Sequence, residues 1–206
     1  MVPSSPPIAE PVSLDEDLQR LLDGRHHDPF SVLGRHPAGR GRVTVRAFCP
    51  DVVALELATG APLERIGQTD LFALTTNDSA VPDRYQLRLR RNDGSDALFW
   101  DPYCFPPQLR DDDLQAWNRG EHTRAQQFLG AHPACVDGVD GTLFAVWAPE
   151  AERVSVVGEF NRWDGRHHPL RVRGSSGVWE IFLPGVGAGT FYKFEIRHGA
   201  SDALLL

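Results

Sequence analysis

Between residues 141 and 198, short runs of β-branched and aromatic residues alternate with segments rich in glycine and charged side chains. Apolar residues recur at every second position, most clearly at Tyr192, Phe194 and Ile196, which would share one face of a strand. The polar residues Lys193 and Glu195 would share the other face. The runs cover 142–147, 153–157, 177–183 and 190–196. Short strands at this spacing are typical of an antiparallel β-sandwich.

An internal duplication appears when an earlier β-rich block, which begins at Arg42, is compared with this segment. Residues 33–37 (LGRHP) return as 129–133 (LGAHP), and 85–89 (YQLRL) match 192–196 (YKFEI). The distance between matching residues is constant within strands but grows by eight between Leu57 and Phe72. We therefore expect two sandwich modules in tandem, the second with an insertion within residues 158–177.

Four regions follow from this pattern: 1–24, a flexible tail and short helix; 25–105, an N-terminal β-sandwich module; 106–135, a connector; and 136–206, a second β-sandwich. Residues 1–12 are rich in proline, which predicts a disordered tail. Ser13 and Glu16 form a potential capping box for a helix that would end at Gly24. The connector is expected to contain short helical pieces broken at Gly120.

Composition narrows the classes of partner. The chain has 206 residues, 41% of them hydrophobic, and a net charge of −7, which disfavours nucleic acid and anionic membranes as partners. A neutral, sugar-like ligand fits this charge better. No apolar run is long enough to span a membrane, and residues 1–7 lack the pattern of a signal peptide. Three widely spaced cysteines predict reduced thiols in a cytoplasmic protein.

Metal and catalytic motifs are weak. Asp111, Asp112 and Asp113 suggest either a cation site or, as we favour, a helix start, because successive carboxylates point in different directions. Adjacent histidine pairs at 26–27 and 167–168 have no further ligand at metal-binding spacing. No nucleophile or phosphate-loop motif is present, so we expect no catalytic residues, no metal and no cofactor.

The insertion contains the most distinctive candidate residue, Trp163, which polar and small residues surround. An indole in such a loop tends to stay exposed, and its flat face suits the C–H face of a pyranose ring, at roughly 0.5–1.5 kcal/mol if aromatic-pair values transfer. Simple packing is the alternative for Trp163. Trp179, which lies within a strand, is a second candidate for sugar stacking, although packing is favoured there. Lys193 is either a solvated surface lysine or a donor to a sugar hydroxyl.

Several segments together carry a resemblance to a known family: 144–149 (FAVWAP), 154–165 (VSVVGEFNRWDG), 177–182 (GVWEIF) and 192–196 (YKFEI). They resemble the family-48 carbohydrate-binding module found ahead of the catalytic barrel in bacterial glycogen branching enzymes. Residues 27–36 (HDPFSVLGRH) and 101–103 (DPY) are similar to the additional N-terminal module of the longer bacterial form. The resemblance implies an all-β chain of two tandem immunoglobulin-like (E-set) antiparallel β-sandwiches.

The resemblance also implies a role. Full-length members are similar to the α-amylase superfamily: they cleave an α-1,4-glucan and transfer the piece to a 6-hydroxyl on a (β/α)8 barrel, with an Asp nucleophile and a Glu acid/base. None of those positions exists in this chain, which implies a non-catalytic region. Its implied partners are an α-1,4-glucan, as glycogen or a maltooligosaccharide, and the catalytic barrel.

By the same resemblance, Trp163 and Lys193 would contact glucan, with Asn161 as a polar supporter. Related modules use a second Trp after the last strand, where this chain has Leu205 and Leu206. We therefore expect weak binding by the chain alone, about millimolar or roughly −4 kcal/mol. The first module lacks the tryptophan loop and has a glutamine in place of the lysine, which predicts no sugar binding of this kind there.

Three functions remain open. The first is an α-glucan-binding region of a glycogen branching enzyme, which we expect. The second is a purely structural scaffold that packs on and positions the catalytic barrel, which exposed apolar surface would favour. The third is an independent hydrolase or transferase, which activity on amylose would establish. The duplicated pattern stops before a second Asp-Pro-Tyr, so we expect an N-terminal portion of a longer enzyme.

Overall fold

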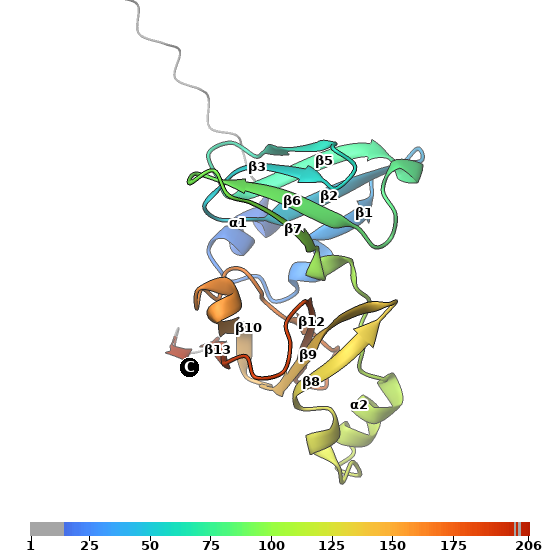
Figure 1. Ribbon diagram of the computed structural model, residues 1–206. Coiled ribbons are helices and arrows are strands. Elements are labelled where there is room, and N and C mark those ends of the chain that lie inside the picture. The colour runs from blue at the N-terminus through green and yellow to red at the C-terminus, as the bar shows by residue number, and fades with distance from the viewer. Residues whose placement is uncertain (1–14, 200, 202) are drawn as a thin grey trace, which may run out of the picture.

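The first module is one antiparallel sheet that folds on itself, at the top of Figure 1. The computed structural model describes residues 15–199, 201 and 203–206. Strand order in this sheet is β1-β2-β5-β4-β3-β6-β7. The strands are β1 Gly34–Pro37, β2 Arg42–Phe48, β3 Val52–Leu57, β4 Pro62–Arg65, β5 Leu71–Asn77, β6 Gln86–Arg91 and β7 Asp96–Trp100. Alternate residues of β2, namely Val43, Val45 and Ala47, are buried and enter the core, as period-two patterning requires.

The second module contains two antiparallel sheets, ordered β11-β12-β9-β8 and β10-β13-β14. Their strands are β8 Gly130–Val136, β9 Val139–Trp147, β10 Ala151–Gly158, β11 Arg171–Val172, β12 Val178–Pro184, β13 Tyr192–His198 and β14 Leu204–Leu205. Tyr192, Phe194 and Ile196 of β13 pack against the core that Phe144, Val154 and Val156 help to form. The four strands predicted in this half are confirmed, and with them the all-β fold class of two tandem sandwiches.

Strand pairing confirms the duplication. Leu55 of β3 pairs with Leu89 of β6, and the matching residues of the second module, Val154 and Ile196, also pair. The repeated LGxHP segments have the same local structure. Their glycines, at φ 89° and 106°, lie in the left-handed region that favours glycine. In both copies the histidine Nε2 contacts the carbonyl oxygen of the repeated leucine, at 2.8 and 3.0 Å.

Strand β12 is buried on both faces, which explains why its sequence shows no clean alternation. Trp179, Ile181 and Leu183 point into the core of the second module. On the opposite face, Val178 packs under the connector and Phe182 joins the core of the first module. The Phe182 ring lies 5.0 Å from that of Phe105, centroid to centroid, in an edge-to-face contact.

Helix α1 spans Glu16–Leu22 and packs Leu18 and Leu21 on the first module. Its N-cap is Asp15, whose Oδ1 accepts the Leu18 N–H at 2.8 Å. Ser13, the predicted cap, lies outside the described residues, as does the predicted tail. Gly24 follows the helix at φ 62°, which fits its predicted role as a helix end.

The connector contains helix α2, Asp111–Asn118, which lies at the bottom of Figure 1. The three aspartates occupy its first turn, where the helix dipole favours negative charge, but the N-cap is Arg110 and makes no side-chain capping bond. Strand β8 begins at Gly130, so it crosses the expected boundary between connector and second module. Short 3-10 helices complete the fold: Pro29–Ser31, Asp78–Ala80, Pro102–Cys104, Ala125–Gln127 and Glu159–Asn161.

Polar contacts also fix the modules to each other. The Tyr103 hydroxyl of the first donates to the carbonyl oxygens of His167 and Pro169 at 3.3 and 3.4 Å. The Arg171 guanidinium donates to the Phe105 carbonyl at 2.6 Å. All three cysteines are free, as predicted. Within the described residues, no helix is both long and apolar enough to cross a membrane.

Candidate functional site

The insertion predicted from the duplication forms the loop that leaves β10 and returns along it. After the 3-10 turn at Glu159–Asn161, Arg162 and Trp163 both adopt left-handed backbone conformations, at φ 56° and 63°. The Trp163 N–H donates to the carbonyl oxygen of Gly158 at 2.9 Å, which closes the turn. Gly158 must be small, because a Cβ there would lie 2.5 Å from the Phe160 ring. Two consecutive left-handed residues turn the chain sharply and set the direction of the indole.

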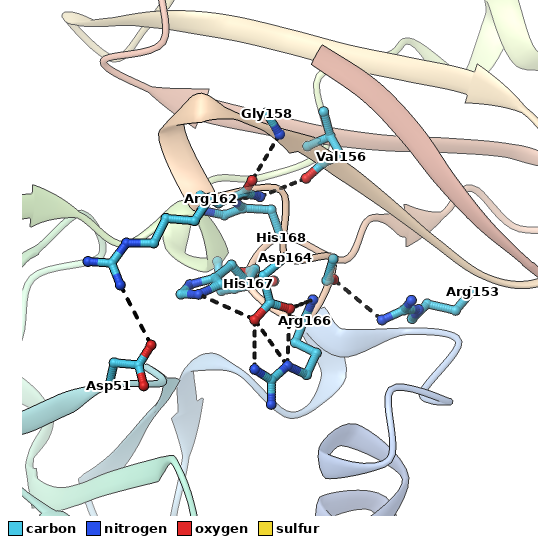
Figure 2. A network of polar contacts seen from close by, with 12 residues as sticks. Asp51, Arg153, Val156, Gly158, Arg162, Asp164, Arg166, His167 and His168 are labelled. Atoms are coloured by element: carbon cyan, nitrogen blue, oxygen red, sulfur yellow. Dashed lines mark hydrogen bonds and ion pairs between the residues drawn. The ribbon is translucent and has the colours of Figure 1, made fainter. Parts of the chain in front are cut away.

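Asn161 holds this loop together from inside. Its side chain is buried, and its Oδ1 accepts the Gly158 N–H at 2.9 Å. Its Nδ2 donates to the Val156 carbonyl and to the His168 Nδ1, both at 2.9 Å. Figure 2 shows the contacts to Gly158 and Val156. The predicted supporter of glucan binding therefore satisfies its own polar atoms within the loop and acts on Trp163 through the backbone.

His168 completes this support as a neutral ring. Burial, together with the smaller effect of the neighbouring His167, lowers its pKa to about 3. A neutral imidazole can accept the Asn161 amide proton at Nδ1, whereas a protonated ring would present a second donor there. The loop conformation is therefore tied to an uncharged His168.

A pocket of about 450 Å³ opens beside Trp163, and we call it the Trp163 pocket. Trp163 exposes 46% of its surface. The lining comes from the end of α1, the loop and the outer face of the sheet β10-β13-β14: Asp23, Gly24, Arg153, Trp163, Asp164, Gly165, Arg166, Glu195, Arg197 and Leu204. The half-exposed indole thus stands at the edge of a hollow in which most of the other side chains are charged.

Four of the six charged side chains that line the Trp163 pocket form two ion pairs. Arg153 and Glu195 form a buried ion pair, in which burial lowers the pKa of Arg153 and Glu195 raises it. Asp164 accepts from Arg166 at 2.7 Å, and this hydrogen bond lowers the pKa of Asp164 (Figure 2). Arginines and carboxylates are equal in number around the pocket, so its formal charge is zero. A lining of many donors and acceptors without net charge suits an uncharged, polyhydroxylated ligand.

The Arg153 Nε in the lining is a buried polar atom without a hydrogen-bond partner among the described residues. The Arg153 side chain is 4% exposed. Its Nη1 donates to the Gly165 carbonyl at 3.4 Å. Gly165 lies so close to Glu195 that a Cβ would be 2.0 Å from its Oε1. The loop is therefore pressed onto the buried pair, and only glycine fits at that contact.

The predicted site residues do not form one cluster. Trp179 is 3% exposed, and its Nε1 donates to the Ala148 carbonyl at 3.0 Å, so the ring belongs to the core and has no face free for a ligand. Lys193 is exposed and pairs with Val157, outside the lining of the Trp163 pocket. It lies two residues before Glu195 and hence on the same face of β13.

Sequence reasoning missed the contribution of the first half of the chain to this pocket. Asp23 and Gly24 line it, and Arg25 reaches Glu152 of β10 at 3.2 Å. It also missed Arg153, although an arginine at the start of an apolar run was a visible signal. No group of three or more metal-binding side chains occurs among the described residues.

Two protein-family models match the chain side by side. Residues 14–103 match "alpha-1,4-glucan branching enzyme GlgB, N-terminal domain". Residues 128–206 match "Carbohydrate-binding module 48 (Isoamylase N-terminal domain)". The second match contains the whole Trp163 loop, and the first contains Asp23 and Gly24.

Curated relatives match almost the whole chain. It is 48% identical over 194 residues to the 1,4-alpha-glucan branching enzyme GlgB of Methylococcus capsulatus, which covers 94% of this chain and 26% of that relative. The 1,4-alpha-glucan branching enzyme GlgB of Cellvibrio japonicus is 46% identical over 203 residues, with 94% and 28% covered. The chain thus spans little more than a quarter of the length of these relatives.

Proposed function

Since the chain belongs to the GlgB branching-enzyme family and matches its N-terminal region, we propose that it is a non-catalytic α-glucan-binding region whose ligand stacks on Trp163. The observation that carries this proposal is the Trp163 pocket. A half-exposed indole stands beside a lining of charged side chains that carries no net charge.

The chemistry of the pocket fits a glucosyl chain. The C–H face of a pyranose ring stacks on the indole, and its hydroxyls bond to Asp23, Asp164 and Arg166 around the edge. A single stacking ring supports only about millimolar affinity, roughly −4 kcal/mol.

Lys193 belongs to the proposal as a contact for longer chains. It is exposed on the outer face of β13, two residues from Glu195, a distance of roughly 7 Å along a strand. A chain of several glucosyl units that leaves the Trp163 pocket along this face reaches the ammonium group. Short sugars that fill only the pocket do not.

Within a longer enzyme, this region would hold an α-1,4-glucan close to the catalytic barrel that transfers segments of it into α-1,6 branches. The relatives' name, 1,4-alpha-glucan branching enzyme, and the share of their length outside this chain support that role. A cytoplasmic location is part of the same proposal, and the three unpaired thiols support it.

A structural scaffold is the second candidate, and exposed aromatic residues favour it. Trp147 exposes 51% of its surface and contacts Trp117 of the connector, with ring centroids 5.9 Å apart. Phe191 exposes 73%. Such rings are suited to packing against a further domain of a longer protein.

An NMR titration with maltoheptaose separates the two functions. Glucan binding predicts saturable shifts of the amide signals of residues 162–166, with cellohexaose, a β-linked control, causing much smaller ones. A folded chain whose signals do not move with maltoheptaose would leave only the scaffold function.

A further inference from the structure

A second hollow, distinct from the Trp163 pocket, lies between the two modules. This intermodule cavity has a volume of about 280 Å³. Aromatic rings from both modules line it: Phe48, Phe99, Trp100 and Tyr103 from the first, and Phe160 from the second. Its lining includes core side chains of both modules, since Leu87 and Leu183 are 0% and 2% exposed. Voids larger than a water molecule are rare in such interiors, so one of this size between rigid walls has the form of a binding site.

Charged side chains mark the mouth of the cavity. Asp51 and Arg162 both line it, yet their side chains are 74% and 67% exposed. Their charged groups lie 3.7 Å apart across the gap between the modules (Figure 2). Arg91 and His167 add donors to the lining. A sugar that enters through this mouth meets hydrogen-bonding groups at its entrance and aromatic rings beyond.

Polar contacts as well as apolar packing join the two modules that enclose the cavity. Tyr103 bonds to the loop backbone at His167 and Pro169, as described above. Arg84 of the first module pairs with Asp137 of the second at 2.9 Å. These contacts fix the position of one module relative to the other and so support the walls of the cavity.

We propose that the intermodule cavity is a second carbohydrate site, which takes the terminal one or two glucosyl units of an α-glucan chain. Its volume lies below the roughly 300–1,000 Å³ of sites for drug-sized ligands, so an extended segment does not fit. Aromatic rings suit the apolar ring faces of a sugar, and the paired charges at the mouth suit its hydroxyls. Only the kind of sugar rests on the proposed function; the cavity and its lining are independent of Trp163.

The loop connects the two sites. Arg162 and Trp163 are consecutive, but Arg162 lines the intermodule cavity and Trp163 lines its own pocket. The wall between the sites is the Asn161–His168 support, whose two side chains also line the cavity. One glucan chain can therefore lie at Trp163 while the end of a neighbouring or separate chain occupies the second site. The loop need not rearrange for both to bind.

The test is an NMR titration of the whole chain with maltotriose, which reads two sets of amide signals. One set reports the Trp163 pocket, residues 163–166, and the other reports the cavity through Phe99 and Trp100. Ala97→Leu adds bulk inside the cavity, where Ala97 contributes to the lining. Ala58→Leu makes the same change at an exposed position outside both hollows and serves as the matched control.

The expected result is that both sets shift in the unmodified chain. Ala97→Leu weakens the response of the cavity set by about tenfold, or 1.4 kcal/mol, and leaves the Trp163 set unchanged. Trp163→Ala does the reverse, and Ala58→Leu changes neither. Should Ala97→Leu fail to fold, Asp51→Ala at the exposed mouth replaces it, with a several-fold loss expected for the cavity set alone.

Two results would overturn the proposal. One is a cavity set that stays still at saturating maltotriose while the chain is folded, and the other is a cavity response that neither Ala97→Leu nor Asp51→Ala weakens. If the cavity signals shift with maltotriose and the Trp163 signals do not, the result contradicts the proposed function but supports the second site.

Discussion

The two modules differ most in the segment that joins β3 to β5 in the first module and β10 to β12 in the second. In the first, β4 pairs with both β3 and β5, so the sheet is continuous around the core. In the second, β11 still pairs with β12, but only the single bridge between Ser155 and Pro169 joins the segment to β10. The residues inserted there form the Trp163 loop. A sandwich can thus gain a binding loop at a sheet edge without any change in its core pairing.

The largest effect on stability is expected from replacing Glu180, a buried carboxylate that the first module lacks. Glu180 is 1% exposed and accepts from Arg173 at 2.5 Å and from the Leu109 N–H at 2.9 Å, whereas the matching residue of the first module is Ala73. Glu180→Ala removes the buried one of the two carboxylates that pair with Arg173, which keeps Asp111 at 2.6 Å, and it leaves the Leu109 N–H without its acceptor. We expect a loss of about 3 kcal/mol in the free energy of unfolding.

Urea unfolding measures this loss. Glu159→Ala, at an exposed position of the loop, is the control and should cost less than about 0.5 kcal/mol. Equal stabilities for the two variants would show that the connector does not depend on the Glu180 network.

Asn161 tests whether the loop needs its internal support. Asn161→Ala removes three hydrogen bonds and leaves the Gly158 N–H buried without a partner, at an expected cost of about 1–3 kcal/mol. Maltoheptaose binding should weaken as well, because the loop no longer fixes Trp163. The control is Asn92→Ala, at an exposed turn of the first module. A variant that loses stability but binds sugar normally would separate the loop conformation from function.

The pH dependence of stability tests whether the loop depends on an uncharged His168. The pKa of His168 is lowered to about 3 in the folded chain, so only the unfolded chain gains this proton as the pH falls below about 6.5. The stability that His168 contributes is therefore present above pH 6.5 and is lost as the pH falls. Between pH 6.5 and 5.5 the loss should approach about 1 kcal/mol in urea unfolding.

His168→Gln keeps an acceptor for Asn161 but cannot titrate. Its unfolding free energy should change less between those pH values than that of the unmodified chain. Exposed His27, changed to Gln, is the control and should leave the difference intact. If His168→Gln shows the same pH dependence as the unmodified chain, other groups are responsible for it.

The smallest expected effect is at Lys193, the only lysine of the chain, which the first module replaces with Gln86. Lys193→Gln should weaken maltoheptaose binding by about two- to fivefold, under 1 kcal/mol, and leave maltotriose binding unchanged. Reductive ¹³C-methylation gives this single side chain its own NMR signal, apart from the N terminus. A signal that stays still during a saturating maltoheptaose titration would remove Lys193 from the site.

Much of the fold could be predicted from the sequence, because the repeat carries information twice. Leu55 and Val154, for example, occupy equivalent positions in the two copies and make equivalent strand pairs. The constant offset between the copies predicted the strands, and the change in that offset predicted the insertion. The N-cap of α1 was harder to predict, because Asp15 and Ser13 are both favourable N-cap residues. The packing of Leu18 and Leu21 decides where the helix begins.

The site was less predictable than the fold. Trp163 could be singled out because its neighbours are polar, yet its pocket depends on Asp23, which is distant in sequence. The buried pair of Arg153 and Glu195 also eluded sequence reasoning, since an alternating strand normally exposes such residues. The structure shows that Asp23 and Gly24, which follow α1, lie over this outer face.

The most direct test is calorimetric titration of maltoheptaose into the chain and into Trp163→Ala, with near-ultraviolet circular dichroism to check that both are folded. The account predicts saturable binding with a dissociation constant on the order of 1 mM, weakened at least about tenfold in the variant. Equal binding by both proteins, or none by the folded unmodified chain up to about 50 mM sugar, would contradict the claim that Trp163 is a glucan platform.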